Sequence, residues 1–130
     1  MKYVGFLQQH DPCLVAEDLL ALPGGSPSPG AEEELAVVTC HQQRAVLVFG
    51  WMHYVSDAQT GEIIAPHVYY TDGEWVWPSY LLHYLGTRNL GAHYAGFVAH
   101  AGSCRSVRVS KAAEAAIEEQ LIRLFQPSIE

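Results

Sequence analysis

Two different spacings of hydrophobic residues divide this 130-residue chain into strand-like and helix-like segments. The longest extended run covers residues 44–56, and its two-residue alternation leaves both faces apolar. Such a run is typical of a central strand that is covered on both sides. A second run around residues 62–71 and a third at Trp75–Trp77 flank Asp72-Gly73, a pair typical of a tight two-residue hairpin turn. Because the connections are short, we expect an antiparallel meander over about residues 44–77.

The end of this meander leads directly into a predicted helix. Trp75 and Trp77 are two residues apart, so both indoles should project from one face of their strand. Pro78 lacks a backbone N–H and has a φ close to the helical value, which suits the first position of a helix over residues 79–85. We therefore expect the hydrophobic core to form around this strand–turn–strand–helix unit.

Three further helices are predicted from capping residues and from hydrophobic spacing. Asp11-Pro12 is a typical start for an amphipathic helix that Pro23 and the following glycines end. Residues 92–101 carry packing side chains at helical spacing and stop at Gly102. Ser110 is a suitable N-cap for the last helix. The predicted buried stripe of that helix is Ala113, Ile117, Leu121 and Leu124.

The segment over residues 31–43 is compatible with two structures. Its three leading glutamates favour a helix N-terminus through the helix dipole, and the apolar residues that follow keep helical spacing. A strand over residues 35–40 is the alternative, and we prefer the helix. Elsewhere, residues 2–8 read as a short strand, and the proline- and glycine-rich residues 23–30 predict a flexible surface loop.

These elements together predict an α+β fold in a single domain over residues 1–130. The expected architecture is a small antiparallel sheet of three to four strands, packed with four to five helices. Nearly half of the residues are hydrophobic, which is enough for a substantial core.

The chain is acidic, with a formal net charge of −7. An acidic surface repels phosphate backbones, so nucleic-acid binding is disfavoured, whereas a basic protein partner would be attracted. No apolar run approaches the length of a membrane span, and no signal-peptide core is evident. Three well-separated cysteines suggest no disulfide framework. We therefore expect a soluble cytoplasmic protein without a membrane-bound form.

Catalytic and metal-binding motifs are not evident in the sequence. Seven histidines occur, but none forms an H-E-x-x-H or H-x-H pattern. His93 and His100 are two helical turns apart, about 10 Å, which is too far for one ion. Cys40 and His41 are adjacent, yet neighbouring side chains point in different directions. We accordingly predict no catalytic residues, no metal and no cofactor.

Tryptophan and tyrosine are abundant, and they suit both core edges and protein interfaces. Most of them should pack the sheet against the helices. An alternative is a small enzyme or ligand-binding domain with a pocket between sheet and helices. The residues expected to line that pocket are Trp51, Trp75, Tyr80 and His83.

The run YYTDGEWVWPSYLLHYL, followed by GFVAHA, resembles a pattern of small bacterial proteins in which TDG-x-W-x-W precedes a proline-started helix and then an EF-x-x-H helix. The opening YVGFLQQHDP and the segment SVRVSKAAEAA resemble it as well. Proteins with this pattern are similar to the immunity proteins of polymorphic-toxin and contact-dependent inhibition systems. This chain departs from the pattern at Gly96-Phe97, where the pattern has an acidic residue before Phe. It also departs at residues 40–43, where a glycine commonly ends the second helix.

The resemblance implies an immunity-type protein that neutralises a bacterial toxin domain by stoichiometric occlusion and not by catalysis. Acidic side chains would then oppose a basic surface of the toxin domain. The expected contact residues are Glu32, Glu33, Glu34, Asp57, Glu62, Asp72 and Glu74. The alternatives are the small enzyme or ligand-binding domain described above and a purely structural homodimer.

Overall fold

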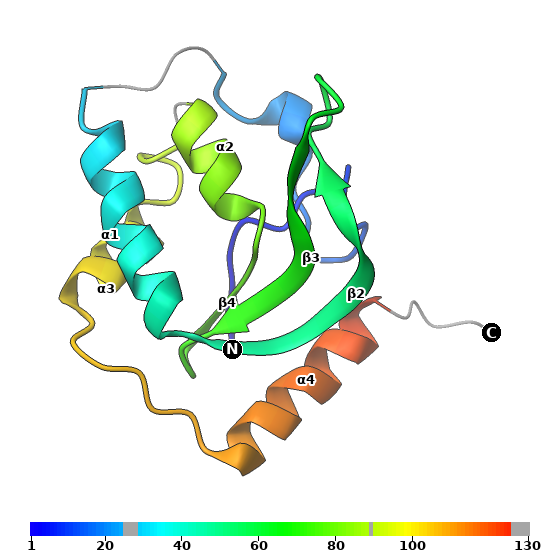
Figure 1. Ribbon diagram of the computed structural model, residues 1–130, viewed down its shortest axis with the longest axis vertical. Helices are drawn as coiled ribbons and strands as arrows, with labels where there is room; N and C mark the ends of the chain where they lie inside the picture. Colours follow the sequence, from blue (N-terminus) through cyan, green and yellow to red (C-terminus); the bar gives the residue numbers. More distant parts are fainter. Residues whose placement is uncertain (25–28, 89, 126–130) are drawn as a thin grey trace.

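The computed structural model describes residues 1–24, 29–88 and 90–125, and the chain forms an α+β fold as predicted (Figure 1). A four-stranded sheet is packed with four α-helices and one short 3₁₀ helix within the described residues. The elements in chain order are β1 (Lys2–Tyr3), η1 (Leu19–Ala21), α1 (Ala31–Arg44), β2 (Val46–Ser56), β3 (Ile63–Thr71), β4 (Trp75–Pro78), α2 (Leu81–Thr87), α3 (Ala95–Ser103) and α4 (Lys111–Phe125).

The sheet has the strand order β1-β4-β3-β2. The predicted antiparallel meander is confirmed, because β2 pairs with β3 and β3 pairs with β4 in antiparallel fashion. The short strand β1 then joins β4 in parallel, which makes the sheet mixed. The predicted strand over residues 2–8 is accordingly much shorter, with only an isolated bridge from Leu7 to Glu17 beyond it.

The position predicted for the strand β2 is wrong, although the strand itself is confirmed. β2 lies at the edge of the sheet and not at its centre, as Figure 1 shows. Most of its side chains are exposed, and only Val48 and Val55 are buried. Hydrophobic alternation identified an extended segment, but it does not report whether other elements cover the two faces.

The predicted helix after Asp11 does not form. Between Asp11 and Leu22 the structure has turns and the 3₁₀ helix η1, and Leu14 is almost fully exposed at 98%. Asp11 instead turns inward, where its carboxylate accepts hydrogen bonds from Tyr69 and Tyr80. These tertiary contacts replace the capping role that Asp-Pro has in an isolated helix.

The hairpin between β3 and β4 differs in detail from its prediction. Gly73 has a φ of +97°, as a tight turn requires, but Asp72 does not have a positive φ. The turn centres on Gly73 and Glu74, because the backbone N–H of Asp72 donates to the carbonyl of Trp75 across them. The Oδ1 atom of Asp72 accepts hydrogen bonds from the backbone N–H groups of Glu74 and Trp75. Asp72 thus stabilises the turn through its side chain.

Pro78 ends β4 and does not begin a helix, which corrects the prediction. It lies opposite Tyr69 in the sheet, and the next backbone N–H, of Ser79, donates to the carbonyl of Val68. Helix α2 begins only at Leu81. Pairing with β3 therefore extends the strand through the proline, whose missing N–H is not needed there.

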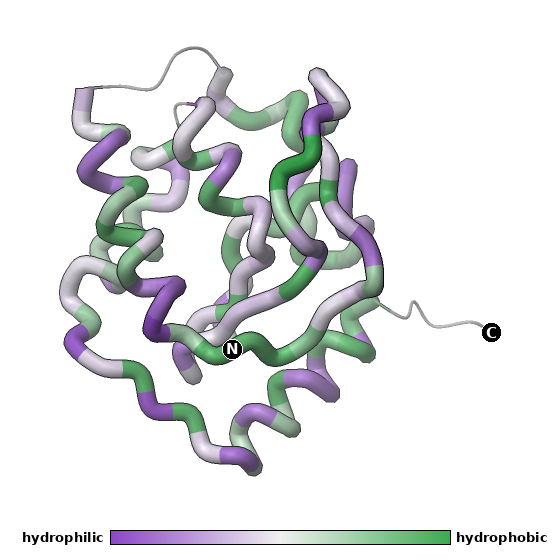
Figure 2. The backbone as a smooth tube through the Cα atoms, viewed as in Figure 1, coloured by the Kyte–Doolittle hydropathy of each residue, from purple (hydrophilic) through white to green (hydrophobic). Residues whose placement is uncertain are grey.

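The other helices agree well with the sequence. The ambiguous segment over residues 31–43 forms α1, and α3 begins three residues later than expected. The Oγ atom of Ser110 accepts a hydrogen bond from the N–H of Ala113 and caps α4. Figure 2 shows hydrophobic and hydrophilic residues alternating along α4, and Ile117 and Leu121 are its buried residues. Residues 25–28 of the predicted loop over 23–30 lie outside the described residues.

The core has two clusters of buried side chains. The larger one includes Trp77, Tyr80 and Phe97 and joins α1, α2 and α3 to the sheet. The smaller one includes Phe6, Tyr69 and the buried residues of α4. Both indoles of β4 pack against Phe97, at ring-centroid distances of 5.3 Å for Trp75 and 5.0 Å for Trp77. The two tryptophans therefore share one face, as predicted.

Candidate functional site

The edge of the sheet carries an exposed strip of large apolar side chains, which we call the edge strip. Met52 is fully exposed at 104%, and Tyr54 and Ile63 are exposed at 64% and 68%. Single exposed hydrophobic residues are common, but four of them along one edge strand are unusual for a protein without a partner. The members of the edge strip are Leu47, Trp51, Met52 and Tyr54 of β2, and Ile63 at the start of the neighbouring strand β3.

The middle of β2 bulges away from its neighbour. Gly50 lies opposite Val68 and Tyr54 lies opposite Pro66, so three residues of β2 face the single residue His67. The extra residues interrupt the alternation that the sequence suggested, and Trp51, Met52 and His53 are all exposed. The bulge therefore presents side chains that a regular strand would pack inward.

A hollow of about 300 Å³ opens beside this bulge. Its floor contains the carboxylate of Asp11, which is 4% exposed. This size suits a small molecule or an inserted side chain better than an extended ligand. The hollow is lined by His10, Asp11, Pro12, Trp51, His53, His67 and Phe125.

Asp11 is the centre of a buried hydrogen-bond network beneath the hollow. Its Oδ2 atom accepts from the Tyr80 hydroxyl at 2.7 Å, and its Oδ1 atom accepts from the Tyr69 hydroxyl. The Tyr69 oxygen in turn accepts from the Trp51 Nε1 at 2.8 Å. A buried carboxylate is costly unless it is well hydrogen-bonded, and these donors meet that requirement.

Burial raises the pKa of Tyr69, and the neighbouring Asp11 charge raises it further. The pKa of Tyr80 is raised well above its usual value for the same two reasons, burial first. Both hydroxyls therefore stay protonated at neutral pH. They act as fixed donors to Asp11 and not as acids or bases.

Two histidines connect Asp11 to the surface. The Nε2 atom of His67 lies 3.0 Å from the Asp11 Oδ1, and the Nδ1 atom of His67 lies 2.8 Å from the Nε2 of His53. Because the carboxylate only accepts, His67 donates to it through Nε2 and accepts from His53 through Nδ1. His53 is exposed, so the chain of groups ends at solvent. Such an arrangement can orient an imidazole for proton transfer.

The acidic residues expected to meet a partner occupy two kinds of environment. Four of them, Glu32, Glu33, Glu62 and Glu74, are exposed, and Glu34 is half-buried. Asp57 and Asp72 are different, because their side chains are only 11% and 1% exposed and each is hydrogen-bonded to histidine. Neither aspartate is therefore free to contact a partner directly.

The lowered pKa of Asp57 leads us to expect a specific pH dependence of the protein's stability. Burial raises the pKa of its carboxyl, but hydrogen bonds from His83, Thr60 and Gln59 outweigh burial and lower the pKa to about 2. Because the folded-state pKa lies below the unfolded value, this stabilisation is present above about pH 4 and is lost towards pH 2.

The measurement compares wild type with Asp57→Asn in urea unfolding between pH 5 and pH 2. We expect the variant to be less stable at pH 5 by about 1 kcal/mol, a figure reduced for screening by water. The difference should shrink towards zero at pH 2. A difference that is independent of pH would contradict this role of the Asp57 charge.

The four residues predicted to line a pocket between sheet and helices do not share one pocket. A hollow of about 420 Å³ does lie between α1, α2 and β3, but of the four residues only His83 lines it. Trp51 lines the hollow described above, and Tyr80 lies behind it as a donor to Asp11. Trp75 instead packs against Phe97 near α3, and His83 is bonded to Asp57 at 2.6 Å. The structure therefore brings two of the four residues together and separates the other two from them.

One group in the described part of the chain has the composition of a metal site. It consists of His41, His100 and Cys104, whose potential ligand atoms lie within 4.8 Å of one another. The spacing of His93 and His100 did not indicate it, because His93 lies before α3 and is bonded to Glu17. The three residues come from segments far apart in the sequence, and only the packing of α1 on α3 brings them together.

The chain matches no known protein family, curated protein sequence or solved structure. No helix within the described residues has the length and apolar character that crossing a membrane requires.

Proposed function

We propose that this protein binds a basic bacterial toxin domain through the edge strip and neutralises it by stoichiometric occlusion. The observation that carries the proposal is the exposure of large apolar side chains on an edge strand. Trp51, Met52 and Tyr54 belong to the residue types that are enriched in the centres of protein interfaces. Covering them would remove this apolar surface from water, which favours association.

Acidic side chains at both ends of the edge strip support a basic partner. Glu62 precedes Ile63 at one end and is exposed. At the other end, Glu114 and Glu118 of α4 line a shallow hollow together with Val48 and Lys111. An apolar centre with charged flanks is typical of a specific interface, and the flanking charges accelerate the encounter with an oppositely charged surface.

The resemblance to immunity proteins gives the same class of function independently of the geometry. Immunity proteins of that kind act as small acidic binding domains. The net charge of −7 agrees with this class. Of the expected contacts, Glu62 flanks the edge strip, whereas Glu32 and Glu33 lie in the first turn of α1 and Glu74 lies in the β3–β4 turn.

The experiment measures binding to the product of the neighbouring gene by isothermal titration calorimetry and measures toxin inhibition in parallel. We expect a complex of one to one stoichiometry that weakens with salt. Met52→Glu should weaken binding at least about tenfold, because it places a charge in the apolar centre of the interface.

The matched control is Leu14→Glu, because Leu14 is about as exposed as Met52 but lies outside the edge strip. It should bind like wild type. Equal loss of affinity in both variants, or an unimpaired Met52→Glu complex, would contradict the proposal. A concentration-dependent mass that is abolished by Met52→Glu would instead identify the edge strip as a homodimer interface.

A second candidate function is acid–base chemistry on a small ligand in the hollow. The chain from Asp11 through His67 to His53 favours it, since it orients an exposed imidazole at the rim. A thermal-shift screen with small molecules distinguishes the two functions. A ligand that stabilises wild type and His93→Gln, but not His53→Gln, would support this candidate over pure occlusion.

A further inference from the structure

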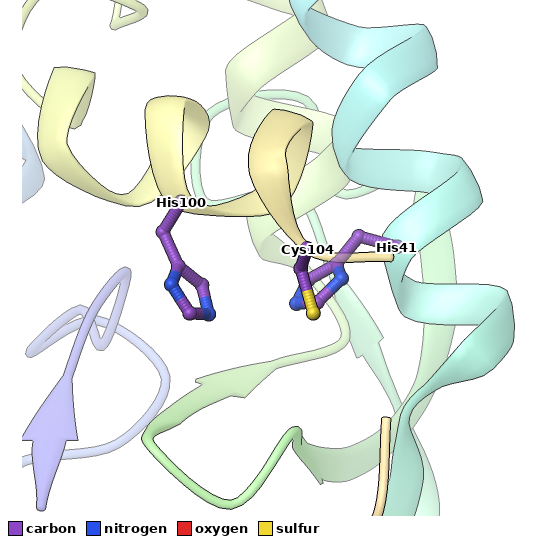
Figure 3. Close-up of side chains that lie close together, drawn as sticks. All are labelled: His41, His100 and Cys104. Carbon is purple, nitrogen blue, oxygen red and sulfur yellow. The ribbon is translucent and has the colours of Figure 1, made fainter. Parts of the chain in front are cut away.

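The packing of α1 on α3 brings two histidines and one cysteine together (Figure 3). His41 projects from α1, His100 from α3, and Cys104 follows the end of α3 directly. The N–H of Cys104 donates to the carbonyl of His100 at 3.0 Å, which keeps these two residues one helical turn apart on the same face. Their side chains therefore face His41 together.

Arg44 holds the backbone of Cys104 in place relative to α1, the helix that carries His41. Its Nη2 atom donates to the carbonyl of Cys104 at 3.1 Å, and Arg44 is the last residue of α1. The backbone of Cys104 is thus held by both helices. The thiol makes only a weak contact with the carbonyl of Ser106 at 3.3 Å, so its side chain is free to turn towards the histidines.

Asp72 orients both imidazoles from the β3–β4 turn. Its Oδ2 atom lies 2.7 Å from the Nε2 of His41 and 2.7 Å from the Nε2 of His100. Because a carboxylate only accepts, each ring donates to it through Nε2. The two Nε2 atoms and the Asp72 Oδ2 therefore converge on one point, and a divalent ion bound there would replace the two protons.

His41 lacks one expected partner. It is fully buried, and its Nδ1 atom has no hydrogen-bond partner among the described residues. Leaving such an atom unsatisfied in the interior is unfavourable. Hydrogen bonding alone therefore does not account for a fully buried histidine at this position. On the outer side, the Glu74 Oε2 lies 3.4 Å from the Nδ1 of His100 and adds negative charge.

We propose that the Nε2 atoms of His41 and His100, the Cys104 thiolate and the Asp72 carboxylate bind one divalent ion of the zinc type. Imidazole and thiolate together suit Zn²⁺, whose bonds of about 2.0–2.3 Å place tetrahedral ligand atoms roughly 3.3–3.6 Å apart. The potential ligand atoms of His41, His100 and Cys104 lie within 4.8 Å of one another, so the longest separation must shorten by about 1.2–1.5 Å through rotation of the side chains. The ion would tie α1, α3 and the β3–β4 turn together.

The proposal is independent of toxin binding, because the cluster is formed by elements other than the edge strip. The test uses the full chain, reduced and freed of metal with a chelator, and titrated with Co²⁺. A thiolate ligand gives a charge-transfer absorption in the near ultraviolet, and tetrahedral Co²⁺ gives intense visible bands. We expect both, at one ion per chain, and displacement by Zn²⁺ together with a raised melting temperature.

Variants assign the absorption to this cluster. Cys104→Ser should abolish the charge-transfer band and weaken binding at least tenfold, and His100→Gln should weaken binding to a similar degree. Asp72→Asn, which replaces the carboxylate by an uncharged amide, should weaken binding at least about tenfold. His41 is fully buried, so the more exposed His100 is the safer histidine to replace.

The matched controls are Cys13→Ser and Cys40→Ser, which remove the other two free cysteines. Both should retain the charge-transfer band and the affinity of wild type. The proposal is overturned by a wild-type titration without thiolate absorption. It is equally overturned by full retention of binding in Cys104→Ser, or by loss of the band in either control.

Discussion

Replacing Trp77 by alanine is expected to lower the free energy of unfolding by about 3–5 kcal/mol. The indole is fully buried and stacks with His41 at a ring-centroid distance of 5.4 Å. Its Nε1 atom also donates to the Gln42 Oε1 at 2.9 Å, so the substitution leaves both a large cavity and an unpaired amide oxygen. Urea unfolding monitored by far-ultraviolet circular dichroism measures the change.

The control for Trp77→Ala is Met52→Ala, which also removes a large apolar side chain, but at full exposure. Its effect should stay within about 0.5 kcal/mol. A loss below about 1 kcal/mol for Trp77→Ala would contradict the central place of this indole in the core. Equal effects of the two substitutions would contradict it as well.

Replacing Asp11 by alanine should also lower the free energy of unfolding by about 3–5 kcal/mol, but for a different reason. The carboxylate is the shared acceptor of Tyr69, Tyr80 and His67. Removing it leaves buried donors without an acceptor, and each such donor costs on the order of 1–3 kcal/mol. The same urea titration measures the loss, and Glu32→Ala removes an equal charge from an exposed site as the control.

A double-mutant cycle separates this network from simple loss of packing. Tyr69→Phe removes one of the orphaned donors, so its cost should be smaller in the Asp11→Ala background than in wild type. We expect a coupling of at least about 0.5 kcal/mol between the two positions. Additive effects would show that Asp11 does not act through the tyrosine hydroxyls.

The elements that could be predicted from the sequence are those that local chemistry determines. Ser110 and the stripe ending in Leu124 define α4, because a cap and a periodic apolar face need no distant partner. Gly73 similarly marks its turn through its positive φ. Both hold in the structure because tertiary contacts reinforce the local preference instead of opposing it.

The predictions that are wrong concern residues whose local role is replaced by a distant contact. Asp11 has the side chain of an N-cap, but three donors more than fifty residues away bind it in the interior. Pro78 has the φ of a helix start, but pairing with β3 retains it in a strand. Nothing in the neighbouring sequence signals such competition.

The candidate sites depend on long-range geometry even more strongly. Trp51 and Met52 look like core residues in a hydrophobicity pattern, and only the strand order shows that they lie on an uncovered edge. Strands β2, β3 and β4 lie between His41 and His100 in the sequence. Asp72, in the β3–β4 turn, is hydrogen-bonded to both imidazoles. Spacing rules detect ligands that share one element, so they do not detect this cluster.

The bulge of β2 also has a consequence for self-assembly. A straight edge strand with apolar side chains can pair edge to edge with identical chains, and repeated pairing of this kind leads to fibrils. Opposite His67 the additional residues of β2 break the hydrogen-bond register, so an incoming strand cannot continue past Gly50 in regular pairing. The exposed apolar side chains of β2 are therefore available to a partner of complementary shape, whereas the bulged backbone opposes open-ended polymerisation of the protein itself.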